Sequence, residues 1–550
     1  MSADADTSRQ RSIYLGLSGL IAVLWLAMLP LRPLFNPDEG RYAEIPREMV
    51  ASGDWIVPHL NGLVYIEKPP LQYWATALSL ELLGNNEFAA RLYTALSALG
   101  SILAVALAAR RLWGGAAGFR AAAILAGMLL FVILGQLLTL DMSLTLYLTV
   151  ALCAFLAAQR SAEEGSSPRG WMLLAWAATG LGMLTKGLVA AAIPGAVLVL
   201  YSAYTRDFKP WRRLHALAGV PLFLVITAPW YVLAARRIPD FLEFFFVHEH
   251  FARYLTPSAD RQEVWWFFGV VFLLGSLPWT LSALKVLFLD WPRPGARGDF
   301  DAALFLKIWV WFVCVFFSLS DSKLIPYILP AMPALALAIA SLPEGFLRRD
   351  LSRTALGTVG LALGLALVCL FAPAHVAPTE RNGYFLALRG PLAEVAALLA
   401  VSGLYVLSRR RREATGGALF LGAGWCLAGL LAMRAAAAVA PIYSGVTLAR
   451  AFPEIPREAP LYSVATYDQT LPFYWRRTVE LVSFRGELDY GLKRDPGAEI
   501  PTVDEFVQRW TLGSNAFAIM EKPMFEELSR RQVPMREIAR DAGRVLAARQ

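Results

Sequence analysis

Long apolar runs alternate with short polar connections along most of this 550-residue chain. A helix needs about 20 apolar residues to cross the hydrocarbon core of a bilayer, and most of the runs approach that length. Residues 438–550 return to the mixed pattern of a globular domain. The apolar runs lie near 12–33, 69–83, 91–109, 119–138, 141–159, 170–185, 187–204, 214–235, 263–289, 301–319, 325–342, 353–373, 388–408 and 415–437. The pattern predicts a polytopic α-helical membrane protein with a small domain at its C-terminal end.

The basic residues orient these runs, because positive charge collects in cytoplasmic loops. If the run 69–83 does not cross the membrane, every clear basic loop falls on the same side as Arg9 and Arg11. That run is short, contains Glu81 and opens with two prolines, which favour a helix start in the interface. The basic loops are Arg110, Arg111 and Arg120; Arg206, Lys209, Arg212 and Arg213; Arg348, Arg349 and Arg353; and 409–412. We therefore expect thirteen spans, a first span that is retained and not cleaved as a signal peptide, and a cytoplasmic N-terminus.

This topology divides the chain into a transmembrane domain, 1–437, and an outer domain, 438–550. It places the loops 34–90 and 236–262 outside as well, and the first of these should carry juxtamembrane helices and the active site. In the outer domain the stretches "LYSVAT", "TVELVSF" and "NAFAIM" have the pattern of strands, and 502–512 and 522–531 have that of helices. A small α/β domain is predicted.

Composition agrees with this reading, since 57% of the residues are hydrophobic and only 17% are charged. Such a balance excludes an ordinary soluble protein of this size. The four cysteines, Cys153, Cys314, Cys369 and Cys426, lie within apolar runs and lack metal-ligand spacing. No Walker or GxGxxG signature stands at a strand-to-helix junction, which disfavours a nucleotide-sugar donor.

The first outer loop contains the most concentrated chemistry, "FNPDEGRYAEIP". Asn36 can cap a helix, with Pro37 at its first position and Glu39 at the third, where a glutamate completes a capping box. Asp38 would then share a helix face with Arg41 and Tyr42. The loop is thus either a well-capped helix start or a site for a polar substrate.

Further polar residues are assigned to the same membrane face, and each has a plain structural alternative. Lys68 and Lys186 could snorkel to the interface or bind a lipid phosphate. Asp141 could start a helix or take part in catalysis. Arg253 and Tyr327 could contact phosphate oxygens. These candidates are Lys68, Asp141, Lys186 beside Gly187, Arg253 and Tyr327. With Asp38 they make two acids, three cations and a phenol, which suits a lipid-linked phosphosugar.

A zinc ion is a separate possibility. Glu67 could join His248 and His250 as ligands, although two histidines at i and i+2 do not share one helix face.

The stretch "FNPDEGRYAEIPREMVASGDWIVPHLNG", followed by "KPPLQYW", Asp141 and the "TKG" turn, resembles the GT-C membrane glycosyltransferases. Within them it is similar to the branch that uses dolichyl- or polyprenyl-phosphate sugars and includes protein O-mannosyltransferases. The resemblance is closest to members that move 4-amino-4-deoxy-L-arabinose from undecaprenyl phosphate to lipid A. It covers about residues 1–340 in detail and the C-terminal third in layout.

The resemblance implies a pentosyltransferase in the bacterial inner membrane, with its active site facing the periplasm. Its partners would be the undecaprenyl phosphate-linked sugar, lipid A and membrane lipids, with no nucleic acid, and it would act as a monomer. Transfer would reduce negative surface charge and give resistance to polymyxin and cationic peptides. Alternatives are a related transferase with a protein or glycan acceptor, and a transporter of lipid-linked sugars. Transporters often contain internal repeats, and the sequence shows none, which disfavours the transporter.

The same resemblance implies roles for the candidate residues. Asp38, Asp141 and Lys186 are expected to be catalytic, and the substrate would be bound by Arg41, Tyr42, Lys68, Arg253 and Tyr327. Because Asp38 is flanked by Glu39 and faces Arg41, it makes a poor metal cage, and we expect no catalytic cofactor. Any zinc would be structural, held by Glu67, His248 and His250.

Overall fold

A computed structural model of the chain describes residues 2–252, 263–292, 299–375, 379–409, 414–513 and 515–549. The chain divides into two compact units. The first comprises Met1–Met28, Tyr93–Leu370 and Pro391–Met433. The second comprises Leu29–Leu92, Phe371–Gly390 and Arg434–Gln550. Each unit is described by itself.

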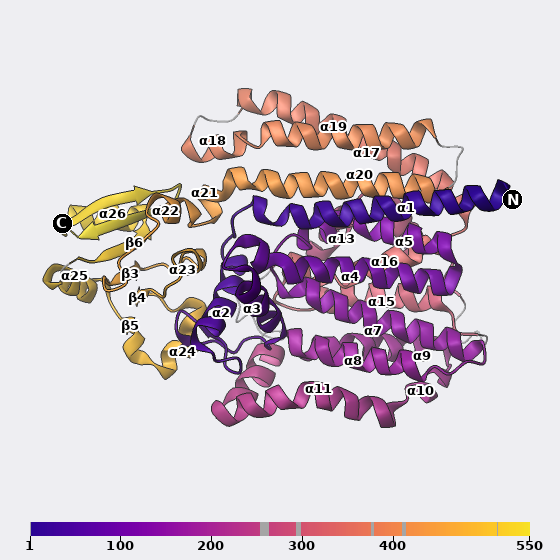
Figure 1. Cartoon of the computed structure of the whole chain (residues 1–550), viewed down its shortest axis with the longest axis horizontal. Coiled ribbons are helices and arrows are strands. Elements are labelled where there is room, and N and C mark those ends of the chain that lie inside the picture. The colour runs from indigo at the N-terminus through magenta and orange to yellow at the C-terminus, as the bar shows by residue number, and fades with distance from the viewer. Residues whose placement is uncertain are drawn as a thin grey trace. The chain divides into compact units, whose positions relative to one another are not determined.

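The first unit is a bundle of apolar helices that run side by side (Figure 1). They are α1 (Ser2–Ala27), α4 (Glu87–Trp113), α5 (Gly115–Ala126), α6 (Leu129–Leu134), α7 (Leu140–Glu163), α8 (Arg169–Lys186), α9 (Val189–Thr205), α10 (Lys209–Arg212), α11 (Ala216–Arg237), α13 (Phe267–Gly275), α14 (Thr280–Phe288), α15 (Ala302–Ser318), α16 (Ala331–Ala340), α17 (Glu344–His375), α19 (Arg389–Ser408) and α20 (Ala414–Ala435). A π-helical turn, η2 (Glu243–Ala252), follows α11, and a 3₁₀ turn, η3 (Ile325–Ile328), precedes α16.

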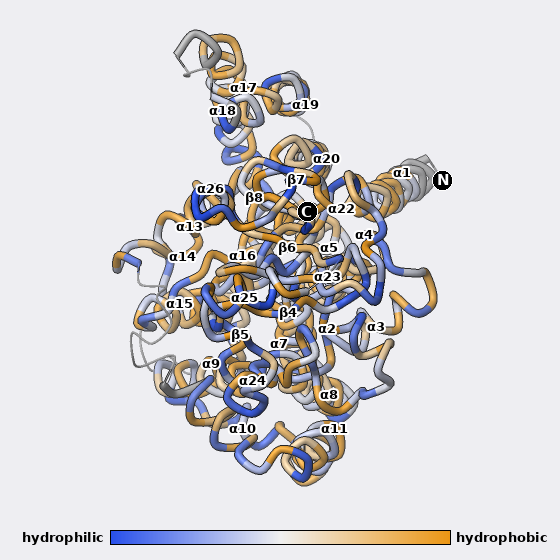
Figure 2. The backbone as a smooth tube through the Cα atoms, turned by 90° about the vertical axis from the view of Figure 1, so that its left-hand side faces the viewer, coloured by the Kyte–Doolittle hydropathy of each residue, from blue (hydrophilic) through white to orange (hydrophobic). Residues whose placement is uncertain are grey.

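Within the described residues, seven helical segments are long and apolar enough to cross a membrane, and four shorter apolar helices accompany them. Apolar residues follow these helices along much of their length (Figure 2). Helices satisfy their own backbone hydrogen bonds, which is what the interior of a bilayer demands. The chain is a multi-pass membrane protein.

Helices occupy each of the thirteen runs predicted to span, but several of those runs are interrupted. The run 119–138 divides into α5 and α6, the run 263–289 into α13 and α14, and the run 325–342 into η3 and α16. The run 69–83 forms α3 (Leu71–Leu83), a 13-residue helix that begins after the two prolines. At about 1.5 Å per residue it is too short to cross a bilayer, as predicted.

Two of the interruptions face one another. A Cβ on Gly127, where α5 ends, would lie 2.7 Å from the Cα of Gly422 in α20, so only glycine permits this approach. The N–H of Leu129 at the start of α6 donates to the carbonyl of Leu277 at 3.0 Å, just before the proline that separates α13 from α14. A backbone N–H at one break thus forms a hydrogen bond with a backbone carbonyl at the other, so neither group is left without a partner.

The second unit begins with α2 (Asp38–Ser52), followed by a short antiparallel hairpin of β1 (His59–Leu60) and β2 (Leu63–Val64), and then α3. Its C-terminal part is a six-stranded sheet in the order β5-β4-β3-β6-β8-β7. The strands β3 (Leu461–Val464), β4 (Glu480–Val482), β5 (Glu499–Ile500) and β6 (Phe517–Glu521) are parallel, whereas β7 (Met535–Arg540) and β8 (Arg544–Arg549) pair antiparallel. The expected small α/β domain is confirmed.

Helices connect the strands of this sheet. They are α23 (Thr470–Trp475), α24 (Asp489–Arg494), α25 (Val503–Leu512) and α26 (Lys522–Arg530). The short helices α21 (Ala440–Tyr443) and α22 (Val446–Ala451) lead into β3, and α18 (Glu380–Leu386) also belongs to this unit.

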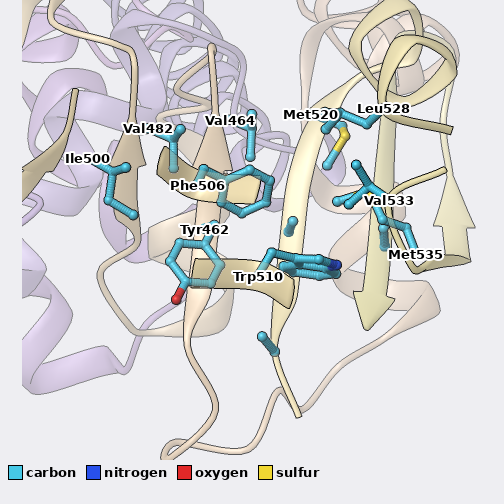
Figure 3. Close-up of a cluster of buried hydrophobic side chains, with 13 residues drawn as sticks. Tyr462, Val464, Val482, Ile500, Phe506, Trp510, Met520, Leu528, Val533 and Met535 are labelled. Atoms are coloured by element: carbon cyan, nitrogen blue, oxygen red, sulfur yellow. The ribbon is translucent and has the colours of Figure 1, made fainter. Parts of the chain in front are cut away.

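The core of the C-terminal domain lies under α25 (Figure 3). Phe506 and Trp510 are fully buried one helical turn apart and pack edge-on against Tyr462 of β3. The Trp510 indole N–H also donates to the carbonyl of Pro534 at 3.0 Å, so its polar atom has a partner. The apolar face of α25 therefore holds this helix on the parallel part of the sheet.

Truncating this core gives a test of the domain. Replacing Phe506 by alanine removes a fully buried ring and should lower the free energy of unfolding by about 3–5 kcal/mol. Leu512→Ala on the same helix is the matched control, because Leu512 is 87% exposed and its loss should change little. Thermal unfolding followed by circular dichroism measures both; equal midpoints for the two variants would contradict this packing.

Candidate active site

The N-terminal turn of α2 holds a guanidinium between two carboxylates. Arg41 Nη1 lies 3.4 Å from Asp38 Oδ1, and Arg41 Nη2 lies 2.5 Å from Glu487 Oε2. Glu487 belongs to the turn η5 (Gly486–Leu488) after β4, and it also accepts a hydrogen bond from Gln469 at 2.7 Å. Arg41 is buried, whereas the side chain of Asp38 is 44% exposed. The accessible acid of this group is thus Asp38.

Phenol rings enclose the same guanidinium. The Arg41 guanidinium lies 5.6 Å from the centre of the Tyr42 ring, and that ring lies 6.2 Å from the ring of Tyr73. Burial raises the pKa of Tyr65 well above its usual value, so its hydroxyl stays protonated and can donate. Burial also raises the pKa of Glu487, against the pull of Arg41. Around Arg41 the unit therefore gathers phenol groups, an amide and carboxyl groups.

The predicted capping box is wrong. The residue before α2 is Pro37, which provides no side-chain cap, and the amide of Asn36 donates instead to Asp468 at 2.6 Å. Glu39 accepts from the N–H of Phe35 at 3.0 Å, but its main partners are the guanidiniums of Arg32 and Arg91. The prediction that Glu39 only caps the helix therefore missed its two arginine partners.

The Glu39 carboxylate forms a bidentate pair with each of two arginines. Arg32 contacts its oxygens at 2.6 and 2.9 Å, and Arg91 contacts them at 2.7 and 3.0 Å. Arg91 also donates to the carbonyls of Leu29, Arg32 and Pro33. Burial would raise the pKa of Glu39, yet the two guanidiniums hold it well below its usual range. The carboxylate stays ionised and ties α2 to the chain on both sides of it.

The C-terminal domain fixes the other side of this turn. Asp468 accepts from Asn36 and pairs with Arg544 of β8, which also pairs with Asp541 at 2.8 Å. A Cβ on Gly40 would lie 2.5 Å from the carbonyl carbon of Gln469, so α2 needs a glycine where the domain meets it. The domain therefore supplies both the second carboxylate on Arg41 and part of the support for α2.

A second polar group lies in the helical unit. Asp141 in the first turn of α7 and Lys186 in the last turn of α8 form an ion pair. The Lys186 ammonium also lies 4.7 Å from the centre of the Tyr327 ring, which η3 supplies. The antiparallel helices α7 and α8 bring the acid and the base together, and Gly187, at φ +79°, ends α8 in a backbone conformation that favours glycine. The structure thus groups three of the predicted site residues.

For the remaining predicted site residues the structure shows fewer contacts. Lys68 donates to the carbonyl of Glu67 at 2.9 Å. His248 is exposed and its ring stacks on that of Phe244 at 5.2 Å. Arg253 and the side chain of His250 lie outside the described residues. Within the part of the chain that is described, no three His, Cys, Asp or Glu residues gather around a common point suited to a metal ion, and the zinc site stays a prediction.

Sequence reasoning missed Glu487 and Gln469 as members of the site. Both lie more than 400 residues from Arg41, in an ordinary surface-like stretch, "FRGELDY" and "YDQT". Neither spacing nor composition connects them to α2, and only the folded domain does.

Comparison with known proteins agrees with these features. Residues 67–232 match the family described as dolichyl-phosphate-mannose-protein mannosyltransferase, and residues 448–549 match the aminoarabinose transferase C-terminal domain. With a bundle of apolar helices and paired charges at its helix ends, the chain is a membrane glycosyltransferase of the GT-C class.

Its relatives define the family more narrowly. The chain is 34% identical to undecaprenyl phosphate-alpha-4-amino-4-deoxy-L-arabinose arabinosyl transferase of Aeromonas hydrophila, over 70% of this chain and 72% of that protein. A second transferase of that name from Sodalis glossinidius is 33% identical over 90% of both chains. The crystal structure of ArnT from Cupriavidus metallidurans bound to undecaprenyl phosphate is 34% identical, covers 97% of each chain and superposes with a TM-score of 0.88. The chain belongs to this family of aminoarabinose transferases.

A third carboxylate of α2 lies deeper. Glu44 is fully buried and makes a bidentate pair with Arg47 at 2.6 and 2.7 Å. Next to it, Glu48 accepts from the backbone N–H groups of Asn61 and Gly62 in the hairpin. Burial raises the pKa of Glu44 to about 8, which is far above the value for an exposed glutamate. Glu44 is therefore a carboxylate of this unit that should couple stability to pH between about 4.5 and about 8.

The sign of that coupling is testable. A raised pKa means that the folded protein holds the proton more tightly than the unfolded chain, so stability should fall as the pH rises from about 4.5 to about 8. Glu44→Gln should flatten that fall, because a glutamine does not titrate. Thermal unfolding midpoints across this pH range measure the slope, and Glu505→Gln, at an exposed site, is the control. If Glu44→Gln kept the wild-type slope, burial would not govern this carboxyl.

Proposed function

We propose that this protein transfers 4-amino-4-deoxy-L-arabinose from undecaprenyl phosphate to phosphate groups of lipid A, at the periplasmic face of the bacterial inner membrane. The observation that carries the proposal is the match along nearly the whole chain to a structure bound to undecaprenyl phosphate. The names of the curated relatives supply the sugar. Modified lipid A would carry less negative charge and would bind polymyxin and cationic peptides less tightly.

The proposed arrangement in the membrane has thirteen spans within 1–437 and a cytoplasmic N-terminus. The basic loops then lie in the cytoplasm, as positive charge in short loops favours. The loops 34–90 and 236–262 and the domain 438–550 lie in the periplasm, and the protein acts as a monomer. Supporting this arrangement, α3 is too short to span, so it does not add a crossing.

The reaction exchanges one phosphate for another on the sugar. An oxygen of the lipid A phosphate forms the new bond to C1, and the bond between C1 and the oxygen of undecaprenyl phosphate breaks with its electron pair on the leaving phosphate. The developing negative charge needs cations placed to receive it. We assign this to Lys68 and Arg253, with Lys186 and Tyr327 contributing donors.

Lys186 has the geometry for this role. An ammonium has three N–H donors, of which one is used by Asp141, so others remain for a phosphate oxygen. Asp141 holds the ammonium against the Tyr327 ring and thereby fixes its direction. In this assignment Asp141 is a positioning residue that acts through Lys186.

Asp38 is the acid for the sugar. The lipid A phosphate is already an anion, so the acceptor needs no strong general base. A carboxylate beside the ring can instead orient its hydroxyls or stabilise positive charge that develops at C1, as carboxylates do in glycosyl transfer. Arg41, held by Glu487 as well, keeps Asp38 in place and close to Tyr42.

A second acceptor class deserves a test because residues 67–232 match a protein mannosyltransferase family. With a serine or threonine hydroxyl as acceptor, Asp38 would have to take a proton as general base. A transporter of lipid-linked sugar, in contrast, would move the sugar without attaching it to a new acceptor.

Mass spectrometry of lipid A separates these possibilities. Cells that express the protein and make the donor should contain lipid A heavier by one aminoarabinose residue, and cells that lack the protein should not. Membrane proteins from the same cells are searched for a glycosylated acceptor. An unchanged lipid A profile under conditions that supply the donor would overturn the proposed acceptor.

Variants of the two polar groups test the assignments. Lys186→Met and Lys68→Ala should each lower kcat by about 10²–10³-fold, the effect of removing one donor to developing charge. Asp38→Asn should lower it without changing the shape of the pH profile, since a general base is not required. Lys493→Ala, at an exposed lysine of α24, is the control. A folded Lys186→Met or Lys68→Ala variant with wild-type turnover would refute that residue's role.

A further inference from the structure

A cavity of about 350 Å³ lies within the helical unit, away from the residues assigned to transfer. Its walls come from α7, α8, α9, α11 and α15, and the segment at α10 closes one end. Along α8 it extends from Met172 to Thr179, so it begins seven residues, or about 10 Å, from Lys186. Figure 1 shows α7, α8 and α9 side by side, with α10 at one end of this group.

The walls are predominantly hydrocarbon. Three polar side-chain atoms among the lining residues are turned to protein partners. The Thr179 hydroxyl donates to the carbonyl of Ala175 at 2.8 Å, the Trp176 indole to that of Leu214 at 2.9 Å, and the Trp211 indole to the hydroxyl of Ser202 at 2.9 Å. Water in a cavity needs two or more polar partners, of which these walls present few. An apolar chain would restore the contacts that the walls lack.

The mouth of the cavity is basic and interfacial. Gly195 and Trp211 line the cavity and are exposed, so it opens on the surface of the bundle. The connection around α10 carries Arg206, Lys209, Arg212 and Arg213 against a single acid, Asp207, a net charge of +3. Phe208 of this connection and Leu217 in the first turn of α11 are exposed, at 64% and 98%, as in segments that rest in a membrane interface.

We propose that this cavity binds an acyl chain of an anionic phospholipid, whose headgroup phosphate rests on the basic connection around α10. The apolar cavity and the adjacent net charge of +3 match the two parts of such a lipid. Under the proposed orientation this end of the bundle faces the cytoplasmic leaflet, where phosphatidylglycerol would be the source. The lipid is a structural ligand and not a substrate, because it lies away from the ion pair of Asp141 and Lys186.

One contact shows how the lipid would act on the bundle. Trp176 packs against Gly219 so closely that a Cβ on that glycine would lie 2.1 Å from the indole ring. The same indole joins α8 to Leu214, just before α11. A chain in the cavity would pack against this tryptophan and hold α8 to α11. Since α8 ends at Lys186, the lipid supports the helix that carries this lysine.

Photolabelling tests the site with the purified full-length protein in detergent. Phosphatidylglycerol with a diazirine on its acyl chain should label peptides that contain Trp176 or Trp211, and phosphatidylethanolamine with the same label should do so more weakly. Each positive charge removed in Lys209→Gln/Arg212→Gln should weaken labelling by phosphatidylglycerol about fivefold. Arg348→Gln/Arg349→Gln, in the basic segment at the start of α17, is the matched control and should leave it unchanged.

A pair of neighbouring alanines tests the cavity itself. Ala191→Phe places a ring in the cavity and should abolish labelling, whereas Ala192→Phe, exposed on the same helix, should not. Undecaprenyl phosphate added in excess should not displace the phospholipid. Equal labelling by the two phospholipids, labelling that survives Ala191→Phe, or displacement by undecaprenyl phosphate would each overturn the proposal. Because the readout is labelling and not transfer, these results are independent of the identity of the acceptor.

Discussion

The buried carboxylate of Glu39 is the interaction on which the site of α2 depends. It lies between two guanidiniums, and one of them, Arg91, also binds three backbone carbonyls of the segment that leads to α2. Removing one partner of such a group leaves an uncompensated buried charge, which costs about 3–5 kcal/mol. The segment before α2 thus has few alternatives, and Asp38 and Arg41 start the helix at a fixed place. Their accessibility follows, since Glu39 turns inward while Asp38 faces outward.

The C-terminal domain completes this arrangement. Its Asp468 binds Asn36, its Gln469 backbone touches Gly40, and its Glu487 shares Arg41 with Asp38. These contacts show that the C-terminal domain packs directly against the start of α2. Because Arg41 bridges the partly buried Glu487 to Asp38, a shift of the domain would move the guanidinium as well. The C-terminal domain therefore forms part of the support that positions Asp38 and Arg41.

The sequence predicted the elements better than their contacts. Apolar run length predicted where the apolar helices lie, and the Pro69–Pro70 pair with Glu81 predicted that the run 69–83 is a short helix, which α3 is. Three strands and two helices of the C-terminal domain were predicted from their pattern, but β5, β7 and β8 were not. β5 has two residues, and β7 and β8 carry arginines where a buried strand would be apolar. The break at Pro278 has a local signal, the proline itself, that counting apolar run length passes over. The break near Gly127 accompanies a close approach to Gly422, which lies far away in the sequence.

In the candidate site, too, local sequence patterns predicted the neighbours along a helix but not the partners from distant segments. Spacing along one helix placed Arg41 beside Asp38, and helix ends on one predicted membrane face grouped Asp141 with Lys186. Capping rules misassigned Glu39, because a glutamate near a helix start has the same pattern whether it binds backbone N–H groups or distant arginines. Arg91 and Glu487, which decide what α2 does, come from segments that no local rule connects to it.

The pair of Asp141 and Lys186 shows why a transferase of charged lipids would keep its cations compensated. A lone ammonium at a helix end within an apolar bundle would be costly to desolvate, and a nearby carboxylate offsets that cost. The same carboxylate lowers the net charge that a phosphate would meet, while the other N–H donors of the ammonium remain for the phosphate oxygens. Such a site favours an anion whose charge grows during the reaction over one whose charge is fixed, because only the former gains as the bond to C1 breaks. A resting ion pair is in this way compatible with selective stabilisation of the leaving phosphate.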